Sequence, residues 1–186
     1  PEGDVFDWLY TDPRIRTMCT ALQDNIFISY ENRQGTALAK GVDTIYEEET
    51  PLAQYVTDGE FRLRMNQRRY AAVGRGFARM MGINRRFVAG LELYYPERGA
   101  RISVANPMAS VNNVTVWPSC EFAVNSDIDN RLIIISRDVM CELTGCTDEV
   151  SAVELRVAES VTPRGLRALK REIASRLDTG LRVLDR

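Results

Sequence analysis

The sequence predicts an α+β fold with two lobes. One lobe is expected to form from strand-helix-strand units at both chain ends, and the other from an inserted mixed α/β segment. Alternating apolar residues near both ends, a helical apolar period near the C-terminus and short mixed elements between them support this prediction. With 186 residues, 45% of them hydrophobic, the chain has enough apolar content for a folded core. We expect the terminal lobe to comprise residues 1–45 and 150–186, and the inserted lobe residues 46–149.

The N-terminal quarter predicts a short helix, a strand and a hairpin. The apolar residues Phe6, Trp8, Leu9 and Tyr10 precede Pro13, and a proline disfavours helical backbone in the residue before it. The helix should therefore end just before this proline. The segments that follow are rich in branched and aromatic side chains, which favour strands. The expected strands span residues 15–22, 26–30 and 36–42, with a turn at 32–35.

Short elements alternate in the middle of the chain. Gly82 and Gly145 each follow a short run with helical character, and glycine commonly ends a helix in left-handed backbone. Residues 96–118 contain little apolar periodicity, so we expect a long loop there. The expected strands span residues 70–73, 91–95, 122–125 and 132–135, and the expected helices span 76–81 and 136–143.

The C-terminal quarter has the clearest pattern. Apolar and charged residues alternate over 150–157, which predicts a half-buried strand. Thr162 is suited to cap a helix whose first residue is Pro163, and an apolar stripe then continues until Gly180. Residues 181–184 are expected to form the second strand of a strand-helix-strand unit with a right-handed crossover.

The chain contains no histidine, which excludes Ser-His and Cys-His catalysis and histidine-ligated metals. The only lysines are Lys40 and Lys170, and neither lies in a phosphate-binding motif. Gly74 and Gly76 suggest a dinucleotide loop, but Arg79 stands where that motif needs its third glycine. We therefore expect the chain neither to bind nor to hydrolyse nucleotide, and to use no cofactor and no metal.

The cysteines follow neither a zinc nor a redox spacing. Free thiols that behave as small hydrophobic side chains are the favoured interpretation, and one structural disulfide in an oxidising compartment is the alternative. The cysteines are Cys19, Cys120, Cys141 and Cys146.

Residues 60–86 form a cationic block with a single acid, Glu60. Such a block can bind the phosphates of nucleic acid or lipid, or it can form a solvated face or pair with acids elsewhere, such as Glu47, Glu48 and Glu49. The low isoelectric point of the chain, about 5.4, favours a solvated or internally paired face and argues against a nucleic-acid partner. The basic residues of the block are Arg62, Arg64, Arg68, Arg69, Arg75, Arg79, Arg85 and Arg86.

Several segments, taken in order, resemble a known family. They are PEGDVFD, DNIFISYENRQGTALAKGVD, TDGEF, YAAVGRGFARMMGINRRF, LELYYPERGARISVANPMASVN and EVSAVELRV, the last followed by a helix and LRVLDR. Together they resemble the periplasmic domain of FtsX-like ABC transporter permeases, in particular the LolC/LolE-type lipoprotein-releasing permeases. The resemblance implies a MacB-like periplasmic core fold over nearly the whole chain.

The resemblance also implies a function. It places the chain in the periplasm as a non-catalytic domain between two membrane helices of an inner-membrane protein, and the start at Pro1 fits an excised segment. The implied partners are a cytoplasmic ATPase subunit, a second permease protomer, a periplasmic lipoprotein carrier and the lipoprotein substrate. The domain would couple cytoplasmic ATP hydrolysis to lipoprotein release towards the outer membrane. The alternatives are a regulatory module that recruits a cell-wall hydrolase and a MacB-type exporter domain.

The loop expected over residues 96–118 is the candidate partner surface. It carries more apolar side chains than a solvated loop needs, and exposed apolar patches commonly mark interaction sites. The alternative is that the segment packs on its own lobe, with Val114 and Trp117 in the core. The residues expected to contact a partner are Met108, Val111, Val114 and Trp117.

Overall fold

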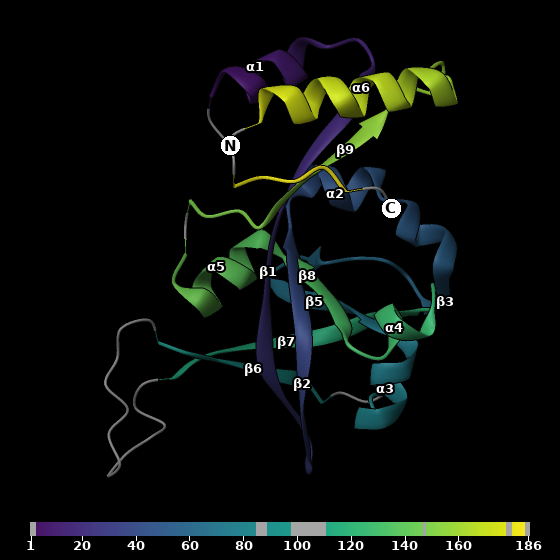
Figure 1. The fold of residues 1–186 in the computed structure, drawn as a ribbon. Coiled ribbons are helices and arrows are strands. Elements are labelled where there is room, and N and C mark those ends of the chain that lie inside the picture. Colours follow the sequence, from purple (N-terminus) through teal and green to yellow (C-terminus); the bar gives the residue numbers. More distant parts are fainter. Residues whose placement is uncertain (1–2, 85–88, 98–110, 147, 178–179, 185–186) are drawn as a thin grey trace. The chain divides into compact units, whose positions relative to one another are not determined.

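The computed structural model describes residues 3–84, 89–97, 111–146, 148–177 and 180–184 (Figure 1). Its structure is mixed α+β, as the sequence predicts. No helix among these residues is long and apolar enough to cross a membrane. Internal contacts divide the chain into two compact units: a first unit of Pro1–Cys19 with Val153–Arg186, and a second unit of Thr20–Ala152. The two lobes expected over 1–45 with 150–186 and over 46–149 stay a prediction.

The first unit is built on two helices, α1 (Asp4–Thr11) and α6 (Pro163–Arg176), which lie side by side in Figure 1. The Thr162 hydroxyl accepts a hydrogen bond from the Gly165 N–H at 3.1 Å, so α6 begins where the sequence predicts. Leu9 of α1 and Leu169 of α6 belong to one buried apolar cluster. The unit also contains most of β9 (Ala152–Val157), which pairs with β1 (Ile15–Tyr30).

Two expectations for the C-terminus are wrong. Helix α6 ends at Arg176, because Leu177 already has extended backbone, and it does not continue to Gly180. Residues 181–184 form no strand. Leu181 and Leu184 are 54% and 76% exposed, and among residues 181–184 only Val183 packs against the cluster of the first unit. An alternating apolar pattern that buries so little surface cannot hold a strand in place.

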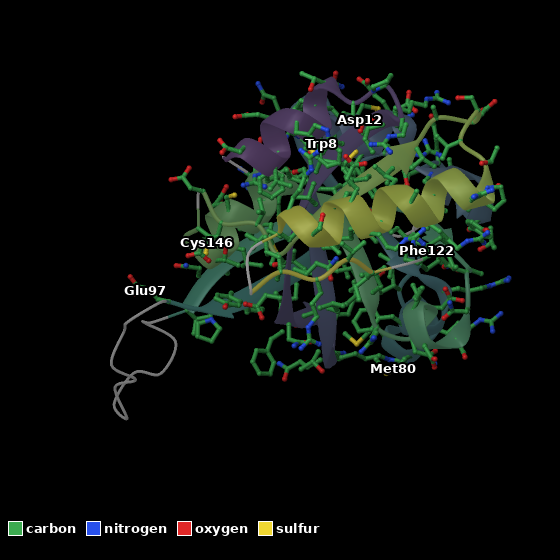
Figure 2. The ribbon with its side chains drawn as sticks, turned by 45° about the horizontal axis from the view of Figure 1, so that its top comes forward. Trp8, Asp12, Met80, Glu97, Phe122 and Cys146 are labelled. Carbon is green, nitrogen blue, oxygen red and sulfur yellow. The ribbon has the colours of Figure 1, made fainter. Side chains whose placement is uncertain are left out.

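Charged groups around Trp8 add to the contact between α1 and α6 (Figure 2). The guanidinium carbons of Arg176 and Arg14 lie 4.1 and 5.9 Å from the centroid of the Trp8 ring. Arg14 also donates to Asp12 Oδ1 at 2.9 Å and to Glu172 Oε2 at 2.8 Å. The hydrogen bonds from Arg14 hold the pKa of the buried Asp12 carboxyl below its usual value.

The second unit contains most of the sheet. Its strand order is β3-β7-β6-β1-β2-β8-β5-β4, and β5 also pairs with β7 in parallel. The pairings β7–β6–β1–β2–β8–β5 therefore close into a circuit. The strands are β2 (Arg33–Val42), β3 (Val56–Gly59), β4 (Arg64–Met65), β5 (Arg68–Gly74), β6 (Leu91–Pro96), β7 (Val111–Phe122) and β8 (Leu132–Ser136).

Strand β8 is buried on both of its faces. Ile133 and Ile135 of β8 belong to one apolar cluster, whereas Ile134 between them belongs to another. Helices α3 (Arg75–Met81) and α5 (Arg137–Thr144) supply side chains to the first cluster. Residues of α2 (Thr44–Glu49), η1 (Pro51–Tyr55) and α4 (Ser126–Asp129) pack in or against the second. Burial on both faces explains the continuous apolar run of β8.

Close backbone approach fixes α5 on the sheet. A Cβ added at Gly41 of β2 would lie only 2.3 Å from Met140 Cβ, so no larger residue fits between the strand and the helix. Both α3 and α5 end as the sequence predicts, because Gly82 and Gly145 adopt left-handed backbone with φ of 64° and 71°.

Other boundaries differ from the expectation. Strand β1 is continuous from Ile15 to Tyr30, and the chain turns at Glu31, whose φ is 51°, before the turn expected at 32–35. The strand expected at 122–125 is wrong, because Phe122 ends β7. The loop expected at 96–118 is wrong for its described C-terminal part, which forms β7, while residues 98–110 lie outside the described residues.

The replacement Asp12→Asn tests the charged contact in the first unit. At pH 7 we expect the free energy of unfolding to fall by about 1 kcal/mol, because a neutral amide cannot form an ion pair with Arg14. The folded pKa of Asp12 lies below its unfolded value, so the ionised carboxylate stabilises the fold above the unfolded pKa, and this is lost as pH falls through the folded pKa. Urea unfolding at pH 7 and pH 3 should show the difference between the two proteins shrinking. An equal difference at both pH values would contradict this role.

Candidate partner-binding site

The structure places three of the four residues expected to bind a partner on one strand, β7. Val111 is half-buried at the start of the strand, opposite Pro96. Val114 is only 5% exposed and belongs to the cluster shared with α3 and α5, so it packs within its own unit. Trp117 is half-buried, and Met108 lies outside the described residues. Their contact with a partner stays a prediction.

Trp117 is held by neighbours from two other segments. In the parallel β5–β7 pairing it stands opposite Tyr70. The guanidinium carbon of Arg68 lies 4.8 Å from the centroid of the indole ring, a cation–π contact. A Cβ added at Gly90 would lie 3.4 Å from Trp117 Cε2, so the indole also passes close to this glycine. The ring therefore has a defined position although it is half-buried.

Three arginines of the cationic block pair with acids, as the interpretation of a solvated or internally paired face allows. Arg64 pairs with Asp138 at 2.6 Å and Arg69 with Glu142 at 2.8 Å, so both acids lie on α5. Arg62 pairs with Glu60 at 2.5 Å. Glu47, expected as an ion-pair partner, instead accepts a hydrogen bond from the Leu63 backbone N–H at 2.6 Å. Arg85 and Arg86 lie outside the described residues.

Two adjoining hollows flank Tyr70 on this surface. The first measures about 430 Å³ and the second about 450 Å³, and both are open to solvent. We call the two together the Tyr70 groove. Gly59, Glu60, Arg62, Tyr70, Pro118 and Ser119 line the first hollow. Met65, Asn66, Gln67, Arg68, Tyr70 and Trp117 line the second.

Sequence reasoning found Trp117 but missed Arg68 and Tyr70 as its neighbours. Arg68 was visible only as one member of the cationic block. Its contact with Trp117 depends on the parallel pairing of β5 with β7, two strands that lie far apart in the sequence. A long-range parallel pairing leaves no local pattern in either strand.

The positions of the thiols do not indicate a redox or catalytic site. Cys19, Cys120 and Cys146 are buried, and Cys120 and Cys146 belong to apolar clusters. Desolvation raises the pKa of the Cys141 thiol, which lowers the fraction of reactive thiolate. The cysteines of this chain thus serve as small apolar side chains.

Comparison with known proteins identifies the fold. No protein-family model and no curated protein matches this sequence. The extracellular domain of the noncanonic ABC-type transporter YknZ from Gram-positive bacteria is similar, with a TM-score of 0.58 and 11% identity, over 92% of this chain and 79% of that one. The periplasmic region of MacB from Actinobacillus actinomycetemcomitans is similar with a TM-score of 0.57 and 8% identity, over 92% and 72% of the two chains. The chain has the fold of the periplasmic region of MacB. This likeness confirms the fold that the sequence resemblance implies.

The replacement Val114→Ala tests whether this residue packs within its own unit. We expect a loss of about 2 kcal/mol in the free energy of unfolding, because truncation leaves a cavity in the cluster shared with α3 and α5. The matched replacement Val111→Ala, at a half-buried position on the same strand, should cost less than half as much. Urea unfolding of both proteins, followed by circular dichroism, measures the difference. If both replacements lowered the free energy of unfolding by the same small amount, Val114 would not be packed in the core and its contact with a partner would be favoured.

Proposed function

We propose that the chain is the extracytoplasmic domain of an ABC transporter permease that couples cytoplasmic ATP hydrolysis to lipoprotein release towards the outer membrane. The observation that carries this proposal is the fold likeness to the YknZ and MacB domains over 92% of the chain. The resemblance of its segments to LolC/LolE-type permeases favours a lipoprotein as the cargo. The domain itself is non-catalytic, and ATP is hydrolysed by a separate cytoplasmic subunit.

The packing of the second unit suits such a mechanical role. A sheet whose pairings close into a circuit and whose strands pack with helices in shared apolar clusters deforms little, so the unit moves as one body. A movement imposed at one end of a strand then reaches the surface that carries Trp117. In this proposal that surface meets a carrier or a lipoprotein when the ATPase subunit and the second permease protomer change state.

Export of the MacB type is the second candidate, and the likeness to the periplasmic region of MacB favours it. The two candidates share the fold and the coupling to ATP hydrolysis. They differ in cargo, because an exporter moves a molecule outward without handing a lipoprotein to a carrier. The cargo released during ATP hydrolysis therefore distinguishes them.

Lipoprotein release from reconstituted membranes tests the proposal. The full permease and its ATPase subunit are placed in vesicles with a labelled lipoprotein, and the soluble fraction is assayed after ATP and a carrier are added. We expect ATP-dependent release that the double replacement Met108→Asp and Val111→Asp lowers by about tenfold or more, because a carboxylate cannot enter an apolar contact. The replacement Asp127→Asn, at an exposed position on α4, is the control and should release normally.

The folding of the variant is checked by circular dichroism before release is interpreted. Normal release by a folded double variant would remove residues 108 and 111 from the mechanism. No ATP-dependent release by the unmodified transporter would contradict lipoprotein transport and leave export as the function.

A further inference from the structure

The Tyr70 groove contains an arginine whose charge is not neutralised. Of the four arginines between positions 62 and 69, three pair with acids. Arg68 makes no ion pair with any residue that the structure describes, and its guanidinium carbon lies over the Trp117 ring, 4.8 Å from the ring centroid. Stacking occupies the face of a guanidinium and leaves its N–H donors, which lie in the plane, able to bind a carboxylate at its edge.

Apolar and neutral polar groups surround this guanidinium. Met65 is 43% exposed, and Arg62 Nη1 lies 2.8 Å from its sulfur, which positions the side chain. The half-buried indole of Trp117 supplies a second apolar surface. Tyr70 lines both hollows, and none of the described residues hydrogen-bonds its hydroxyl. The groove thus offers an apolar contact, a cation and a neutral hydroxyl close together.

The net charge of the groove indicates how much negative charge it accepts. Arg62 and Arg68 bring two positive charges, and Glu60 brings one negative charge, so the sum is one positive charge. The side chain of Glu60 is 75% exposed in the first hollow and repels a multiply charged phosphate or an anionic membrane surface. A single carboxylate beside an apolar side chain matches this balance.

The dimensions fit an extended chain. Two adjoining hollows of about 430 and 450 Å³ on either side of one tyrosine exceed the space that a single side chain fills. In an extended peptide, side chains two positions apart point the same way and are separated by roughly 7 Å. We propose that the Tyr70 groove binds an extended peptide segment of a partner protein, with an acidic side chain on Arg68 and an apolar side chain against Met65 and Trp117.

This inference rests on the proposed function only for the identity of the partner, which would be met on the extracytoplasmic side. Binding itself is a property of the whole 186-residue chain in solution and needs neither ATP nor a membrane. Failure of peptide binding therefore leaves the proposed function untouched. Failure of lipoprotein release, in turn, leaves the groove untouched.

Peptide titration followed by NMR tests the groove. The probe is the capped peptide acetyl-Gly-Leu-Glu-Leu-Gly-amide, and the matched peptide carries Gln in place of Glu. We expect saturable shifts of the Trp117 indole resonance with the acidic peptide. Affinity should fall about tenfold with the Gln peptide and about tenfold in the Arg68→Gln variant, because each change removes the charge-assisted hydrogen bonds. The Arg79→Gln variant, changed at an exposed arginine of α3, should bind as the unmodified chain does.

Several outcomes would overturn the inference. One is equal binding of the Glu and Gln peptides, which needs no variant and so holds even if Arg68→Gln fails to fold. Another is no shift at millimolar peptide. A third is a shift of the Trp117 resonance by inorganic phosphate, or by vesicles of anionic phospholipid, that is as strong as the shift by the acidic peptide. That result would assign the groove to phosphate or to a membrane surface instead.

Discussion

The parallel pairing of β5 with β7 is the constraint on which the second unit depends. It joins β5 to β7, which are otherwise connected only through β6, β1, β2 and β8, and so closes these six strands into a circuit. Strand β8 of this circuit is buried on both faces, as the opposite clusters of Ile133 and Ile134 show. The contact at Gly41 follows from this, because a helix that covers a two-sided core must approach the backbone closely.

The same pairing creates the candidate site. Tyr70 stands opposite Trp117 in the register of β5 and β7, and Arg68 reaches the indole from the start of β5. The register also shifts between Ala71 and Ala72, where Ser119 is the extra residue of a bulge next to Pro118. A bulge re-aims the side chains around it, and here it separates the surface residues of the groove from the buried end of β7. Trp117 is therefore only half-buried because of its place on the strand next to the bulge.

Local chemistry made several elements predictable. Thr162 and Pro163 mark the start of α6, and Gly82 and Gly145 mark the ends of α3 and α5, because caps act within one turn. The predictions from sequence failed where contacts between distant segments, or the lack of them, decide the structure. In the sequence, Pro118 suggests a loop. In the structure it lies in β7 next to a bulge, where a proline can be accommodated. Residues 181–184 alternate as a strand does but bury little surface. The site was predictable only through Trp117, since its contact with Arg68 requires the pairing of distant strands.

The central claim is that this MacB-like fold belongs to the extracytoplasmic side of a membrane transporter, and thiol labelling tests it most directly. Ser126 is exposed at the start of α4, and in a Cys141→Ser background the replacement Ser126→Cys gives this domain one accessible thiol, because Cys19, Cys120 and Cys146 are buried. The same protein without Ser126→Cys is the control for thiols elsewhere in the full-length chain. Intact spheroplasts that express the full-length protein are treated with a maleimide that does not cross membranes. The account predicts labelling without lysis. Labelling that requires lysis would place the domain in the cytoplasm and contradict it.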